Sequence, residues 1–128
     1  MSYCFSKTLS VPFDEGVSRV TAALKEEGFG IITEIDVKET FKKKIGAEFR
    51  NYPILGACTP ASAYEALMLE DKVGTMLPCN VIVQELSDGK VEVAAIDPVA
   101  SMQAIDNPAL KQKAQAIQAK LRNVIEGL

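Results

Sequence analysis

Cysteine is the residue type with the most distinctive chemistry in this sequence, and one cysteine lies where a helix is expected to begin. Cys58 stands directly before Thr59, a residue that can cap a helix, and Pro60, a residue suited to the first helical position. The unpaired N–H groups and positive dipole end at such a place lower a thiol pKa and attract anions. Cys58 is therefore a candidate reactive thiolate or part of an anion site. The alternative is a structural role, since cysteine often packs as a small apolar side chain.

A second cysteine, Cys79, lies between Pro78 and Asn80 where a strand is expected to begin. Asn80 could hydrogen-bond a ligand or only a nearby turn. Taken alone, Cys79 is interpreted as structural, and so is Cys4 in the first expected strand. Cys58 and Cys79 together are harder to explain by packing, because each lies at the end of an element.

The separation of Cys58 from Cys79 permits the two thiols to meet but does not require it. The pair is not a CxxC motif. Two cysteines supply half of a tetrahedral metal shell, so carboxylates or a second subunit would have to complete it. The sequence therefore leaves any metal or cofactor unidentified.

Glu34 and Asp36 form a carboxylate pair on one face of an expected strand, at i, i+2 spacing. Such a pair can do acid–base work where burial separates the two pKa values. The alternative is that Asp36 caps a helix and Glu34 faces solvent. A glycine-rich phosphate loop is not found, because the glycines of 28–30 precede a strand rather than a helix. The predicted ligand-binding residues are Cys58, Thr59, Pro60, Cys79, Asn80 and Glu34.

Composition excludes several classes of mechanism. The chain has no histidine, which removes Ser-His-Asp and Cys-His hydrolysis and imidazole metal sites. The net charge of −3 and the 6% of aromatic residues argue against a nucleic-acid partner. No apolar run is long enough for a membrane helix, and no secretory signal is visible. We expect no membrane association, and an odd number of cysteines favours a reduced, cytoplasmic location.

Alternation and helical periodicity predict one α+β domain over residues 1–128. Strands are expected at 2–9, 30–35, 80–86 and 91–96, and a turn at 87–90 joins the last two. A further strand is expected at 47–57, and its interruption near Pro53 suits an edge strand or a bulge. Helices are expected from Phe13 to Gly28, from Asp36 to Gly46, after Thr59, after Asp97 and after Asn107.

The last helix carries an apolar seam with steps of four and three residues. A helix lying across a sheet explains this seam, and contact with another subunit is the alternative. The seam consists of Leu110, Ala114, Ile117, Leu121, Val124 and Leu128.

The chain resembles the domain-of-unknown-function 302 family, a group of small bacterial and archaeal proteins. The similarity covers nearly the whole chain, and its specific part is the two cysteine segments, 54–60 (ILGACTP) and 73–81 (VGTMLPCNV). It also includes 27–29, 34–38 and 96–98. One departure is Thr59, where the family more often has asparagine. The resemblance implies an antiparallel sheet covered on one face by helices, a fold like that of the TATA-binding-protein class, and a homodimer. It names no activity.

Three functions remain open, and the sequence does not decide whether the protein is an enzyme. The first is a small binding or accessory protein that holds a small anionic or thiophilic ligand, such as a soft metal or a sulfur species, near Cys58 and Cys79. The second is a structural or interaction homodimer with buried cysteines. The third is a thiol-dependent redox protein or enzyme using Cys58, for which a base other than histidine would be needed.

Overall fold

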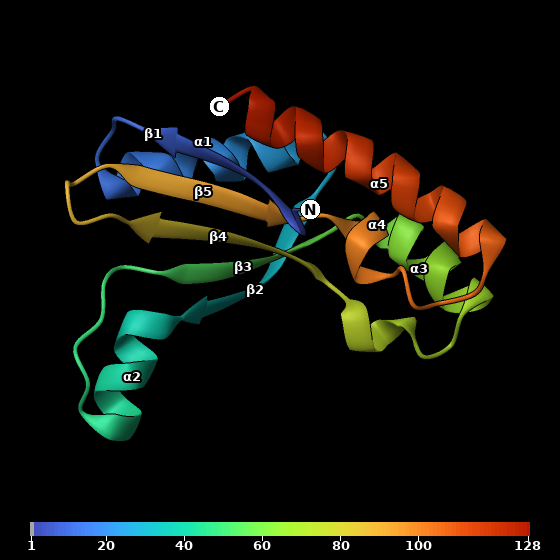
Figure 1. Ribbon diagram of the computed structural model, residues 1–128, viewed down its shortest axis with the longest axis horizontal. Helices are drawn as coiled ribbons and strands as arrows, with labels where there is room; N and C mark the ends of the chain where they lie inside the picture. The colour runs from blue at the N-terminus through green and yellow to red at the C-terminus, as the bar shows by residue number, and fades with distance from the viewer. Residues whose placement is uncertain (1) are drawn as a thin grey trace.

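The computed structural model describes residues 2–128, which form one antiparallel sheet with helices around it (Figure 1). The sheet has five strands in the order β1-β5-β4-β3-β2. The elements in chain order are β1 (Cys4–Leu9), α1 (Phe13–Glu26), β2 (Gly30–Asp36), α2 (Val37–Ile45), β3 (Pro53–Cys58), α3 (Pro60–Leu69), the 3₁₀ helix η1 (Val73–Met76), β4 (Cys79–Glu85), β5 (Val91–Ile96), α4 (Pro98–Ser101) and α5 (Pro108–Glu126). The predicted α+β class with an antiparallel sheet and helices is confirmed. The narrower likeness to the TATA-binding-protein class stays a prediction.

Strict alternation in the central strands creates one buried sheet face. Val81 and Val83 of β4 and Val91 and Val93 of β5 are fully buried, whereas the residues between them are partly exposed. Because side chains on a strand point alternately to the two faces, these valines all lie on the face that carries the core.

Helices α1 and α5 cover this buried face (Figure 1). Val20 and Leu24 of α1 and Leu121 and Val124 of α5 belong to the same core cluster as the strand valines. The apolar seam of α5 therefore packs inside the molecule, as the helix-on-sheet interpretation predicts.

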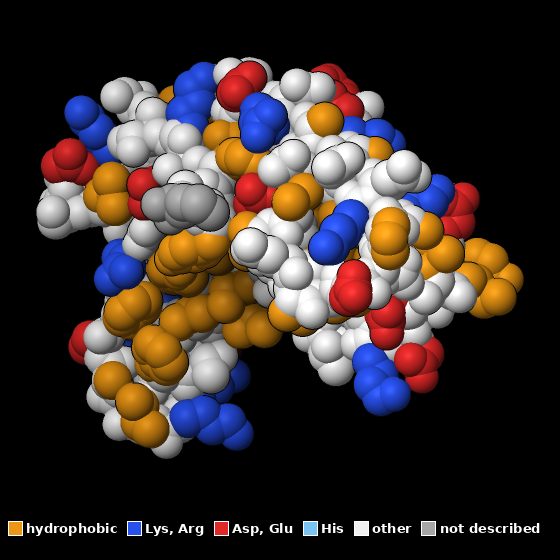
Figure 2. Space-filling view, turned by 45° about the vertical axis from the view of Figure 1, so that its right-hand side comes forward, with side chains coloured by type: hydrophobic (Ala, Val, Ile, Leu, Met, Phe, Trp, Pro, Cys, Tyr) orange, Lys and Arg blue, Asp and Glu red, His pale blue; other side chains and the backbone are white. Residues whose placement is uncertain are grey.

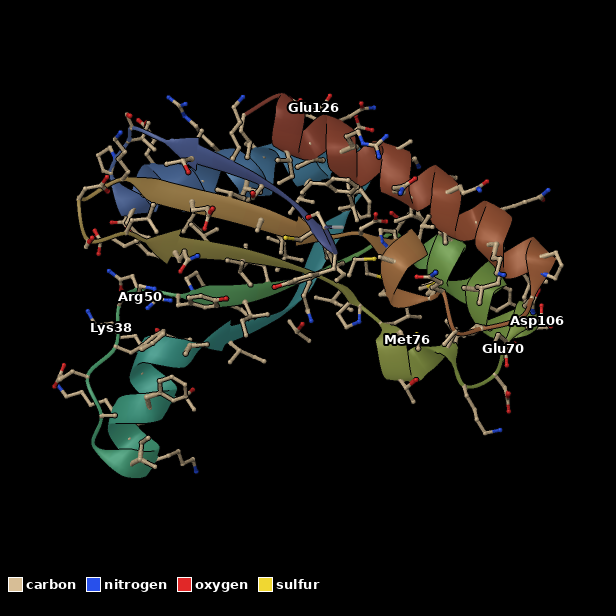
Figure 3. The ribbon with its side chains drawn as sticks, in the orientation of Figure 1. Lys38, Arg50, Glu70, Met76, Asp106 and Glu126 are labelled. Atoms are coloured by element: carbon tan, nitrogen blue, oxygen red, sulfur yellow. The ribbon has the colours of Figure 1, made fainter. Side chains whose placement is uncertain are left out.

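Helices α3 and α4 lie beyond one end of the sheet and pack against the first half of α5. Their small core contains Ala66, Val73, Met102, Leu110 and Ala114. Figure 3 labels Glu70, Met76 and Asp106 at this end of the molecule. Here Asn107 accepts a hydrogen bond from the Leu110 N–H at 3.2 Å, which caps α5, and donates one to the Leu69 carbonyl at 2.9 Å.

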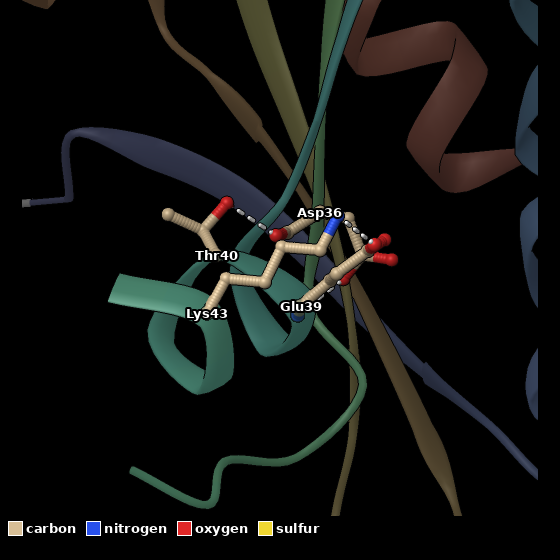
Figure 4. Close-up of polar contacts among 4 residues, drawn as sticks. All are labelled: Asp36, Glu39, Thr40 and Lys43. Carbon is tan, nitrogen blue, oxygen red and sulfur yellow. Dashed lines mark hydrogen bonds and ion pairs between the residues drawn. The ribbon is translucent and has the colours of Figure 1, made fainter. Parts of the chain in front are cut away.

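Helix α2 projects from the β2 edge of the sheet as an arm (Figure 1). The Asp36 carboxylate accepts the Glu39 N–H at 3.0 Å, and Gly46 ends the helix with a φ of 67°, as the sequence predicts. Glu39 also pairs with Lys43 at 2.7 Å, and its hydrogen bond and charge raise the pKa of the Lys43 ammonium (Figure 4). These local contacts position the arm, although no residue of α2 is buried.

The prediction of a strand over residues 47–57 is wrong in its first half. The strand begins at Pro53 and pairs with both β2 and β4, so it lies inside the sheet rather than at an edge. Proline fits the first position of β3, where a missing N–H costs least. The irregularity of pairing lies in β2, between Ile31 and Thr33. Within residues 2–128, no helix is long and apolar enough to cross a membrane.

Candidate functional site

The register of β3 and β4 brings the two cysteine segments together at one end of the sheet. Ala57 is opposite Cys79, so Cys58, the last residue of β3, lies next to the start of β4. The chain then turns directly into α3 at Pro60. Cys58 therefore lies at the mouth of a helix and Cys79 at the entrance of a strand, as predicted, and the two positions are neighbours.

Both cysteines line a pocket of about 50 Å³ between the sheet end, α3 and α5. That volume exceeds the minimum for one water molecule and suits an ion or a ligand of a few atoms. The walls are mostly apolar, and the lining residues that carry sulfur, oxygen or nitrogen on their side chains are Cys58, Thr59, Ser62, Cys79, Met102 and Lys113. An apolar pocket with a few convergent polar groups is the usual form of a small-ligand site.

The Thr59 hydroxyl does not cap α3, although the sequence predicts that it does. Thr59 occupies the N-cap position of α3, but its side chain makes no capping hydrogen bond. Its Oγ1 atom is buried and without a hydrogen-bond partner among residues 2–128. Thr59 lines the pocket, so this hydroxyl is available to a small ligand or a water there. Leaving such a group unsatisfied costs about 1–3 kcal/mol, which a ligand could recover.

Cys79 is buried, with 8% of its surface exposed, whereas Cys58 is half-buried. Burial first, and then the nearby charge of Cys58, raises the pKa of the Cys79 thiol to about 11. Burial acts in this direction because it disfavours the charged thiolate. The register of β3 and β4 brings Cys58 and Cys79 close to each other. At neutral pH, Cys79 is a protonated thiol.

Met102 and Lys113 also line the pocket, and the sequence did not single them out. Met102 follows α4 and is 6% exposed, and Lys113 comes from α5 and pairs with Glu65 of α3. No local motif marks either residue. Met102 shares a pocket with the two cysteines only because the fold places the end of α4 against the end of the sheet.

The other three predicted ligand residues do not line this pocket. Pro60 is exposed at the first position of α3. Asn80 is opposite Gly56 and exposed on the other face of the sheet, because it follows the inward-facing Cys79. Glu34 lines a separate cavity of about 320 Å³ between α1 and β2.

That separate cavity brings together Glu34, Asp36 and Asp14, so the predicted carboxylate pair does share one face. Within residues 2–128, however, no three or more histidine, cysteine, aspartate or glutamate side chains are grouped to hold a metal ion. Asp36 is also occupied as the cap of α2. The cysteine pocket is therefore the stronger candidate site.

Comparison with known proteins agrees with the resemblance seen in the sequence. The model of a family described as "Domain of unknown function DUF302" matches residues 5–128. A search of the curated proteins finds no match. Among solved structures, an uncharacterized conserved protein DUF302 from Bacillus stearothermophilus superimposes with a TM-score of 0.90 at 26% identity, covering 98% of each chain.

Proposed function

The chain belongs to the DUF302 family, and from that premise we propose that it is a small binding protein whose cysteine pocket holds a soft, thiophilic cation, Cu(I) being the best match. The observation that carries the proposal is that three sulfur-bearing side chains, Cys58, Cys79 and Met102, line one pocket of about 50 Å³. Thiolate and thioether ligands select soft ions such as Cu(I) over magnesium or calcium. A sulfur species is the other ligand class that two adjacent thiols admit.

Three sulfur ligands suit Cu(I) better than a structural zinc ion. Zinc sites are almost always four-coordinate, and no further cysteine, histidine or carboxylate group accompanies the pair within residues 2–128. On binding, each of Cys58 and Cys79 would lose its proton to solvent and donate a lone pair to the ion. Met102 would donate a lone pair without losing a proton.

The charge of such a complex is compatible with its position. Two thiolates around one monovalent cation carry a net charge of −1. Cys58 lies at the N-terminal end of α3, a helix of ten residues whose dipole favours negative charge there. The ammonium of Lys113, already paired with Glu65, lines the same pocket. These groups offset part of the cost of burying an anionic complex.

A thiol enzyme is less well supported than a binding protein. The pKa of Cys79 near 11 leaves it protonated at neutral pH, so it is not an activated nucleophile. Burial of both thiols for packing alone would not explain the orphaned Thr59 hydroxyl beside them.

The proposal predicts one tight Cu(I) ion per chain in the reduced protein. The measurement is an anaerobic titration against a chromophoric Cu(I) chelator. Cys58→Ser and Cys79→Ser should each weaken binding by about 100-fold or more, and Met102→Leu by about 10-fold, because loss of a ligand costs at least as much as loss of an outer-shell partner. Affinity should rise with pH, because binding releases the two thiol protons.

Two matched variants serve as controls for this titration. Cys4→Ser removes a thiol that does not line the pocket, and Met76→Leu removes a thioether packed in the same small core as Met102. Both should bind Cu(I) like the wild type. Equal binding by the wild type and the Cys58→Ser/Cys79→Ser double variant would refute the proposal.

We also propose that the protein is a cytoplasmic homodimer. The free state of its cysteines suits a reducing compartment. Large apolar side chains exposed on the surface, including Ile35, Ile45 and Met68, suit a protein with a partner. Light scattering at micromolar concentration tests the dimer.

A further inference from the structure

The sheet face opposite α1 and α5 carries a continuous apolar row. Strand register aligns Ala94 of β5, Ile82 of β4, Ile54 of β3 and Ile35 of β2 directly across four strands. We call this set the apolar row. Ile35 is 50% exposed and the other three members are partly buried, and α1 and α5 lie on the other side of the sheet (Figure 1). Contiguous apolar surface of this kind marks an interaction site more often than a free surface.

Helix α2 extends the apolar surface beyond the sheet edge. Val37, Phe41 and Ile45 are spaced at i, i+4 and i+8, so they form one stripe along the arm. Ile45 is 73% exposed and Phe41 is 37% exposed. Phe41 packs edge-on against Phe49 with ring centroids 5.2 Å apart. A helix of nine residues with no buried side chain is marginal by itself, so a partner packed on this stripe would stabilise it further.

The arm and the apolar row together enclose a hollow. Figure 2 shows hydrophobic side chains running without a break from the sheet onto the arm, with lysine and arginine side chains toward its tip. Figure 3 shows Arg50 at the root of this hollow, where β3 begins. The apolar floor therefore has a ridge, α2, along one side.

We propose that this surface is the homodimer interface, and that α2 of each copy lies in the hollow of the other. This rests on the homodimer of the proposed function and adds where the two copies meet. A second copy is the occupant that fits because one chain carries both the ridge and the hollow. With two copies related by a two-fold axis, the ridge of each copy would fill the hollow of the other, and no ridge or hollow would remain exposed.

Charge complementarity supports the same occupant. Within residues 2–128, Lys42 and Lys44 near the tip of the arm make no ion pair, and neither does Glu92 on the open face of β5. Glu92 accepts a hydrogen bond from Gln84 at 2.7 Å, and Gln84 accepts one from Arg50 at 2.9 Å. An arm that crosses the partner's sheet from β2 toward β5 would bring its lysines to Glu92.

The composition of the surface also suits a dimer. The apolar row, the α2 stripe and Phe49 form an apolar centre. Polar groups flank the row, with Gln84 and Glu92 on one side and Thr33 and Asn80 on the other, and would form the polar rim of an interface.

A second exposed apolar surface on α3 provides the control. Met68 is 72% exposed, which matches the 73% of Ile45, and Tyr64 and Leu67 lie near it on the same helix. A glutamate at position 45 or at position 68 would lie in solvent in the monomer, so neither Ile45→Glu nor Met68→Glu should unfold the chain. The two variants therefore test which surface is covered.

The test is the dimer dissociation constant of purified wild-type, Ile45→Glu and Met68→Glu proteins, measured by sedimentation equilibrium. We expect Ile45→Glu to raise the constant by at least 100-fold and Met68→Glu to leave it within about three-fold of the wild type. Glu92→Lys should weaken the dimer, and adding Lys42→Glu and Lys44→Glu should restore it. Circular dichroism checks that each variant is folded.

The outcomes separate the two proposals. A wild type that is monomeric at micromolar concentration overturns both the dimer and its location. If the wild type is a dimer and Ile45→Glu leaves it intact, only the proposed location is overturned. If Met68→Glu alone loses the dimer, the interface lies on α3 instead. Cu(I) binding by monomeric Ile45→Glu should be unchanged, because the pocket lies on the other side of the sheet.

Discussion

Replacing Gly56 by alanine is expected to lower the free energy of unfolding by about 3 kcal/mol or more, at the upper end for overpacking. A Cβ atom there would lie 2.0 Å from Thr33 Oγ1 and 2.6 Å from Pro78 Cγ. Both distances are far below contact, and the proline ring cannot rotate away as a flexible side chain does. Pro78 precedes Cys79, so relieving the clash would also move the pocket wall. Urea unfolding measures the first effect, and the Cu(I) titration measures the second.

Gly74→Ala is the matched control, because the nearest atom to its new Cβ would be Leu67 Cδ2 at 3.7 Å, an ordinary contact. We expect its stability to change by less than 1 kcal/mol. If Gly56→Ala costs no more than Gly74→Ala, then the close approach of β2, β3 and Pro78 is not as described.

Alkaline pH is expected to destabilise the fold through Cys79 by about 2–3 kcal/mol, since one pKa unit corresponds to 1.36 kcal/mol. The pKa of this thiol is raised from 9.0 to about 11 in the folded chain. Between these values the unfolded chain has lost the proton and the folded chain keeps it, so stability falls as pH rises. Below pH 9 the contribution is fully present. Above pH 11 it is lost.

The measurement compares urea unfolding of the wild type and Cys79→Ala from pH 8 to pH 11 at one protein concentration. The stability advantage of the wild type should shrink across this range by about 2–3 kcal/mol. Val81→Ala provides the control, because it makes a neighbouring cavity without removing a titrating group. A constant difference between wild type and Cys79→Ala would contradict the burial of the thiol.

Local chemistry made most of the elements predictable from sequence. The caps Asp36, Asp97 and Asn107 each hydrogen-bond the backbone that follows them, as their spacing predicts. The start of β3 is not predictable from residues 47–52, which contain β-forming side chains but take part in no strand ladder. Pairing of β3 with β2 begins only at Pro53, opposite Asp36. Strand boundaries set by a distant partner leave no signal in the segment itself.

For the same reason, only part of the candidate site could be predicted from the sequence. Helix and strand signals beside Cys58 and Cys79 gave their separate environments, but only the β3–β4 register makes them neighbours. Thr59 looked like a cap because residue type predicts capping, whereas its hydroxyl is buried beside the pocket. Met102 comes from an element far along the chain, and nothing around it in the sequence points to a site.

The most direct test of the sulfur-lined pocket is the X-ray absorption spectrum, at the copper edge, of the protein loaded with one equivalent of Cu(I). A first shell made only of sulfur is expected in the wild type, and a shell with one sulfur fewer in Met102→Leu. A shell containing mainly nitrogen or oxygen, or a sulfur shell that persists in the Cys58→Ser/Cys79→Ser variant, would contradict the proposed site.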